Sequence, residues 1–274
     1  MKKMNIIKFD AQLLYWTCFR NPSSINFIIS YPVPPPTTIF GMVMNAMGRA
    51  QDDYYSLLDE IKIAIKILNS GEKIIDLMRY KKTADRKRSI LTKSASKKIE
   101  NGDIKLKRKI IERIKNLNEF LTEEEIKELI SNQSSIFGED FSEIYYDQPI
   151  RTEQIIEPKF RIFLGVNDAD FAEMLLERLK DPIRPLYLGR SDDMVGISNI
   201  KIFKDMDAKK INYVDTIYHG FINDSTMVKL PVKFKKVGRS HECIMKSFCI
   251  FDERKKLEKP EKGYNLEEDY VIFT

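Results

Sequence analysis

The chain has 274 residues, of which 43% are hydrophobic and 32% are charged, and its formal net charge is +5. A hydrophobic fraction of this size builds a substantial core, which excludes a disordered protein. No apolar stretch approaches the roughly 18 residues that a membrane-spanning helix needs, so we expect no membrane partner. The three cysteines form no C-x-x-C pair, which argues against a disulfide framework or a thiolate metal site and favours a reducing, cytoplasmic setting.

The first predicted element is a half-buried strand over residues 5–15, where apolar and polar residues alternate. Its apolar side consists of Ile7, Phe9, Ala11, Leu13 and Tyr15. A helix is predicted next, because four prolines between Tyr31 and Thr38 impose an extended approach to it. We expect Thr37 to cap this helix, which would run from Thr38 to Met47 and end at Gly48.

A second alternating strand is predicted at residues 61–67, and a further strand candidate lies at 74–80. The charge along the chain is uneven after these segments. Residues 79–118 contain 15 basic and four acidic side chains, a net charge of +11. The sign then reverses, and Thr122-Glu123-Glu124-Glu125 predicts a short acidic helix to about Ile130.

The rest of the chain alternates between strands and one helix. A strand is predicted over residues 160–164, followed by an amphipathic helix that starts near Asp170 and ends before Pro182. Further strands are expected near 196–204, 213–219, 226–236, 242–251 and 269–274. Without the insertion at about 79–150, residues 1–204 have the α+β order βαββαβ of a ferredoxin-like domain, which RNA-recognition modules share. Residues 205–274 form a strand-rich C-terminal part.

The basic insertion is the strongest functional signal. Like charges at this density repel one another, which favours an exposed element that contacts a polyanion and binds it in a salt-dependent way. Tyr80 adds a ring for base stacking beside Lys81 and Lys82. The alternative interpretation is a solvated lysine-rich loop.

Two further segments fit anion binding, each with a structural alternative. The amides at the start of the predicted helix, with Thr37 and Thr38, suit a phosphate, although the same residues suit an ordinary rigid helix start. Gly189 allows an unusual backbone turn before Arg190, whose guanidinium suits a phosphate. Arg190 suits an ion pair with Asp192 or Asp193 equally well.

Catalytic patterns are weak. The two histidines, His219 and His241, lie near the C-terminus, and no metalloprotease, nucleotide-binding or nucleophile-elbow motif is present. Tyr80, Lys81 and Lys82 are residue types that metal-free RNA cleavage uses, but their spacing is not diagnostic. The sequence therefore predicts no catalytic residue, metal or cofactor.

Three segments resemble a known protein family. Residues 30–41, SYPVPPPTTIFG, closely resemble the start of the first helix in CRISPR-associated RAMP proteins of the Cas-five type. Residues 186–193, LYLGRSDD, resemble the second signature of that family, and residues 149–162 resemble its return strand. The resemblance covers about residues 5–204 and suits type I-A or I-B systems.

This resemblance implies a non-catalytic subunit of a type I interference complex, Cascade, with the basic insertion as its thumb. Such a subunit holds the 5′ handle of the guide RNA, contacts the Cas-seven-type backbone subunit and the large subunit, and meets target DNA indirectly. The implied handle site comprises Arg20, Tyr31, Thr37, Thr38 and Arg190. The looser correspondences in the thumb and its base are Lys81, Lys82, Arg86, Arg88 and Arg151.

Two alternatives belong to other functional classes. One branch of the family, in type I-C systems, cuts precursor RNA with Tyr, Lys and His residues, so a metal-independent endoribonuclease is the first alternative. The chain has no histidine before His219, which disfavours it. The second alternative is a protein-only scaffold whose basic segment faces an acidic partner.

Overall fold

The computed structural model describes residues 3–24, 27–50, 54–83, 145–237 and 240–273. The chain divides into two compact units, one of Met1–Asp76 with Arg151–Thr274 and one of Leu77–Ile150. In the second unit the described residues are 77–83 and 145–150. They belong to β5 (Glu72–Thr83) and β6 (Tyr145–Ile156), two strands that pair with each other. The acidic helix predicted at 122–130 lies outside the described residues.

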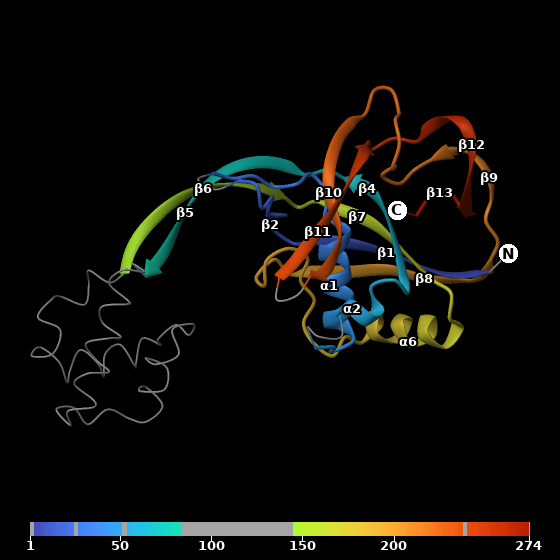
Figure 1. Cartoon of the computed structure of the whole chain (residues 1–274), viewed down its shortest axis with the longest axis horizontal. Helices are drawn as coiled ribbons and strands as arrows, with labels where there is room; N and C mark the ends of the chain where they lie inside the picture. The colour runs from blue at the N-terminus through green and yellow to red at the C-terminus, as the bar shows by residue number, and fades with distance from the viewer. Residues whose placement is uncertain (1–2, 25–26, 51–53, 84–144, 238–239, 274) are drawn as a thin grey trace, which may run out of the picture. The chain divides into compact units, whose positions relative to one another are not determined.

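A four-stranded antiparallel sheet organises the first unit (Figure 1). Its spatial order is β4-β7-β1-β8. The strands are β1 (Met4–Leu13), β4 (Ile61–Asn69), β7 (Lys159–Val166) and β8 (Val195–Met206). Helix α1 (Pro36–Ala46) lies between β1 and β4 in the chain, and α6 (Ala169–Lys180) joins β7 to β8. The predicted α+β class is confirmed, with strands dominant.

One face of this sheet packs on the two long helices. Alternate side chains of β1, such as Ile7 and Phe9, are fully buried in one core with Val43 of α1 and Leu175 of α6. The period of two in the strand and the apolar stripe of each helix bring these residues together. The N-terminus of α6 is capped by Asp168, whose carboxylate accepts a hydrogen bond from the Phe171 amide at 2.7 Å.

The other face of the sheet carries charges and is covered by the C-terminal part. Arg161 of β7 donates to Asp10 of β1 at 2.7 Å and to Asp269 at 3.0 Å. Lys66 of β4 donates to the same Asp269 at 2.7 Å, and Lys8 of β1 donates to Glu267 at 2.6 Å. Asp269 is completely buried. RNA-recognition modules stack bases on the open face of their sheet, whereas here the chain itself covers that face.

The C-terminal part consists of two small sheets. Three strands, β9 (Lys209–Val214), β12 (Lys255–Leu266) and β13 (Asp269–Val271), form one sheet in the order β13-β12-β9. The hairpin of β10 (Thr226–Val237) and β11 (Ser240–Ile250) forms the other. The sequence did not predict β12, and the strand expected at 213–219 is wrong, because β9 ends at Val214. The remaining short elements are β2 (Trp16–Thr17), β3 (Phe27–Ile28) and α2 (Tyr54–Leu57).

We expect acid to loosen the C-terminal part from the sheet. Hydrogen bonds from Lys8 and Lys201 lower the pKa of Glu267 from 4.5 to about 2. Burial of Asp10 opposes its ionisation, but hydrogen bonds from Arg161 and Asn199 outweigh this and lower its pKa. Lowered carboxyl pKa values stabilise the fold above the unfolded-state pKa, and this stabilisation is lost as the pH falls from about 4.5 towards 2.

Thermal unfolding followed by circular dichroism between pH 7 and pH 2 measures this effect. The Glu267→Gln variant removes one titrating group, so its melting temperature should fall less steeply than that of the wild type below about pH 4.5. Identical profiles for the two proteins would show that Glu267 does not contribute to the acid sensitivity.

Candidate nucleic-acid interface

The loop between α6 and β8 is organised around one buried carboxylate. Asp193, which is 4% exposed, accepts hydrogen bonds from the Arg190 amide at 3.0 Å and from the Arg190 guanidinium at 3.0 and 3.2 Å. The sequence left two roles open for Arg190, a phosphate contact or an ion pair with a neighbouring aspartate. In the structure Arg190 forms the ion pair, with Asp193. Burial opposes the charge of Arg190, but the hydrogen bonds and charge of Asp193 outweigh it and raise the guanidinium pKa.

Asp193 also ties this loop to the segment after β1. Its Oδ2 atom accepts hydrogen bonds from the Thr17 hydroxyl at 2.8 Å and from the Cys18 amide at 3.3 Å. Gly189 has φ of +124°, and a Cβ atom there would lie 2.7 Å from Asp193 Oδ2. The loop therefore needs glycine at this position, both for its backbone conformation and for its close approach to Asp193.

Two exposed aromatic side chains lie at the surface that this network holds. Tyr15 is 69% exposed and Trp16 is 56% exposed, and their ring centroids are 6.3 Å apart. Together with Arg190, Asp192, Asp193 and Met194 they line a shallow pocket of about 360 Å³, which we call the Tyr15–Trp16 surface. Exposed apolar groups that lie together mark interaction sites on a protein surface.

The chemistry of the Tyr15–Trp16 surface suits unpaired nucleobases. Aromatic rings and guanidinium planes stack on the faces of bases, and this contact does not depend strongly on sequence. The Arg190 side chain is 25% exposed, so part of it reaches the surface. The sequence interpretation missed this surface, because it placed Tyr15 on the buried side of a strand that in fact ends at Leu13. The adjacent aromatic pair, which includes the single tryptophan of the chain, was a signal for it.

Comparison with known proteins supports the predicted family resemblance. Residues 12–113 match the family described as CRISPR-associated protein (Cas_Cas5). This match supports the predicted resemblance to CRISPR-associated proteins of the Cas5 family. The matched segment includes Tyr15 and Trp16 as well as the proline run.

Solved CRISPR structures are similar to this chain. One is a chain of a CRISPR RNA-guided surveillance complex, with 14% identity, a TM-score of 0.49, and coverage of 92% of this chain and 91% of that chain. Another is a CRISPR protein from Archaeoglobus fulgidus, with 15% identity, a TM-score of 0.45, and coverage of 98% and 99%. Both TM-scores are below 0.5, so the assignment rests on the family match. No curated protein matches the chain.

The start of α1 differs from the prediction. The helix begins at Pro36 and follows Pro35, which makes no side-chain cap. Thr37 is therefore not the capping residue, and its hydroxyl instead lies 3.5 Å from the Pro231 carbonyl of β10. The Thr38 amide donates to the Pro35 carbonyl at 2.9 Å. The hairpin packs against this end of the helix. Pro36 removes one of the unpaired amides of the first turn, and the Ile39 amide donates to the Pro35 carbonyl at 3.1 Å.

Three other predicted RNA contacts lie around the proline run and β6. Arg20 is exposed and its backbone bridges to Ser30. Arg151 is exposed on β6, opposite Phe27 of β3. Tyr31 is 4% exposed, and its burial raises the pKa of its hydroxyl, so its ring is part of the core and offers no stacking face.

The predicted thumb residues are described in part or not at all. Lys81 and Lys82 lie on β5, where the structure describes the backbone but not these side chains. Arg86 and Arg88 lie outside the described residues. The roles of all four residues in RNA binding stay predictions.

The described residues contain no group of three or more His, Cys, Asp or Glu side chains that could hold a metal ion. His219 is exposed, and its Nδ1 atom lies 2.8 Å from the Ser247 carbonyl. In the same described ranges, no helix is both long and apolar enough to cross a membrane.

Proposed function

We propose that this Cas5-family chain is a non-catalytic, RNA-binding subunit of a CRISPR interference complex. In this role it holds the 5′ handle of the guide RNA and contacts the backbone and large subunits of a type I Cascade. The Tyr15–Trp16 surface carries the proposal, since two exposed rings beside an oriented guanidinium suit splayed bases of a single strand. Both rings lie within the segment that matches the family.

The proposal includes a ferredoxin-like domain with a thumb. The chain order β1, α1, β4, β7, α6, β8 and the spatial order β4-β7-β1-β8 support this domain assignment. The net charge of +11 over residues 79–118 supports a phosphate-binding role for the thumb. The C-terminal part covers the second face of the sheet, which supports a base-binding role for Tyr15 and Trp16, just after the end of β1.

The variant with Tyr15→Ala and Trp16→Ala tests the proposal. Each lost base stack costs about 1–3 kcal/mol, so we expect RNA affinity to fall roughly tenfold to a hundredfold or more. The measurement is fluorescence anisotropy of a labelled single-stranded repeat RNA at several salt concentrations. Both rings are exposed, so the fold should persist. The matched control is Phe221→Ala, which removes a ring that is 65% exposed and does not line this surface.

The same binding reactions, run in EDTA, test the non-catalytic part of the proposal. We expect the labelled RNA to be recovered intact. A single discrete cut would instead favour the metal-independent endoribonuclease. Equal affinity of the double variant, the Phe221→Ala control and the wild type would overturn the assignment of the Tyr15–Trp16 surface as the RNA site.

A further inference from the structure

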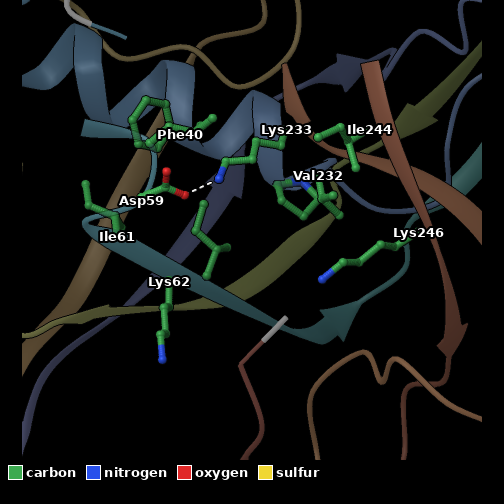
Figure 2. Close-up of a pocket in the computed structure, with 11 residues that line it drawn as sticks. Phe40, Asp59, Ile61, Lys62, Val232, Lys233, Ile244 and Lys246 are labelled. Atoms are coloured by element: carbon green, nitrogen blue, oxygen red, sulfur yellow. Dashed lines mark hydrogen bonds and ion pairs between the residues drawn. The ribbon is translucent and has the colours of Figure 1, made fainter. Parts of the chain in front are cut away.

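A second surface pocket lies where the β10–β11 hairpin meets the start of α1 and the start of β4 (Figure 2). Its volume is about 270 Å³, just below the range of about 300–1,000 Å³ for small-molecule sites. Its lining residues are Pro36, Phe40, Leu58, Asp59, Ile61, Lys62, Ile63, Val232, Lys233, Ile244 and Lys246. We call it the hairpin pocket.

The apolar wall of the hairpin pocket is aliphatic. Ile244 of β11 is 38% exposed and Val232 of β10 is partly buried, so both offer methyl groups to an incoming group. Phe40 is the aromatic residue among the lining residues, and it is 1% exposed because its ring packs edge-on against Tyr54 at 4.6 Å. The pocket therefore accepts an apolar side chain but presents no ring on which a base could stack.

The rim of the hairpin pocket is positively charged. Three lysines and one aspartate line it, which gives a net charge of +2. Lys233 pairs with Asp59, as Figure 2 shows. Figure 2 shows Lys246 extending from β11 towards the other lining residues and Lys62 pointing outward from β4 at the edge of the pocket. Neither lysine has an acidic partner within 4 Å among the described residues. Two lysines are thus available to carboxylates of a partner.

We propose that the hairpin pocket docks an acidic segment of a partner protein, which inserts one aliphatic side chain and places flanking carboxylates on Lys62 and Lys246. Buried apolar anchors supply most of the affinity of such contacts, while rim charges supply orientation and selectivity. The Tyr15–Trp16 surface has the opposite character, with exposed rings and a guanidinium. This docking site goes beyond the proposed RNA-binding function and does not depend on it.

The test uses the full chain with labelled methyl groups on Ile and Val, observed by nuclear magnetic resonance. The probe is the synthetic peptide SEEGLGEES, and the comparison peptides are SEEGSGEES, which lacks the apolar anchor, and SKKGLGKKS, which reverses the charge. A nine-residue uridine RNA tests the nucleic-acid alternative. We expect the Ile244 and Val232 methyl signals to shift saturably with the first peptide and far less with the other probes.

The variant with Lys62→Glu and Lys246→Glu should weaken this peptide affinity at least about tenfold, because it turns two attractive rim contacts into repulsive ones. The matched control is Lys229→Glu on β10, an exposed lysine that does not line the pocket and should leave the affinity unchanged. Ile244→Ser should remove the response of the Val232 methyl signals without harming the fold, since the Ile244 side chain is 38% exposed.

Three results would overturn the proposal. They are the absence of a saturable methyl shift at millimolar peptide, an equal response to the peptide without leucine, and a response of the same methyl groups to RNA but not to peptide. Failure here leaves the anisotropy result for the Tyr15–Trp16 surface unchanged, so the two proposals fail separately.

Discussion

Replacing Asp269 with alanine should lower the free energy of unfolding by about 3 kcal/mol, because it removes a buried carboxylate that two cations share. Arg161 keeps Asp10 at 2.7 Å and Lys66 keeps Asp215 at 3.5 Å, which places the cost at the low end for a broken buried pair. Asp269 is completely buried, and its two oxygens accept hydrogen bonds from Lys66 at 2.7 Å and from Arg161 at 3.0 Å. The Lys66 and Arg161 side chains are 18% and 14% exposed, so water only partly replaces the lost carboxylate.

Urea unfolding measured by circular dichroism checks this expectation. The matched control is Glu268→Ala, which removes another carboxylate from the same Arg161 at 2.9 Å. Glu268 has a side chain that is 72% exposed, so its loss should cost less than about 1 kcal/mol. Equal destabilisation by the two variants would show that burial of Asp269 does not control the stability of this network.

Replacing Asp193 with alanine should lower the free energy of unfolding by about 2–3 kcal/mol and also weaken RNA binding. The carboxylate is buried and accepts hydrogen bonds from Thr17, Cys18 and Arg190. A buried amide or hydroxyl that loses its acceptor costs about 1–3 kcal/mol. Arg190 is partly exposed, which limits the cost of losing its ion pair with Asp193.

The expected loss of RNA affinity arises because Asp193 positions other residues, not because Asp193 contacts the RNA itself. Without Asp193, the Arg190 guanidinium and the segment after Trp16 lose the anchor that holds them at one surface. The control is Asp192→Ala, which removes the exposed neighbouring carboxylate and should leave the fold intact. Anisotropy and urea unfolding are measured on both variants. RNA affinity that is unchanged in folded Asp193→Ala protein would contradict the positioning role.

The two variants act on different connections of the chain. Asp269 joins the C-terminal part to the face of the sheet that RNA-recognition modules leave open. Asp193 instead joins the loop between α6 and β8 to Thr17 of β2. We therefore expect Asp269→Ala to reduce stability more than it reduces RNA affinity of the folded protein, and Asp193→Ala to reduce both.

The features that the sequence alone determined depend on neighbours along the chain. The alternation over residues 5–15 and 61–67 predicted β1 and β4, because a period of two requires only local residues. Gly48 follows the C-cap of α1 with φ of +66°, a left-handed conformation that glycine favours at helix ends. The proline run and the LYLGRSDD segment predicted the family resemblance, and the family match over residues 12–113, which contains the proline run, supports it.

Other features depend on residues that are distant in the sequence. Strand β12 has no clear alternation of apolar and polar residues, and it contains Pro260 in the register shift between Lys256 and Glu261. Its extended conformation therefore depends on its pairing with β9. Arg190 had two carboxylates within reach along the chain, and the position of Asp193 beside Thr17 and Cys18 decided between them. Thr37 lost its capping role to packing against Pro231. Local patterns specify strands and helices, whereas the partner of a polar side chain depends on which strands the fold brings next to it.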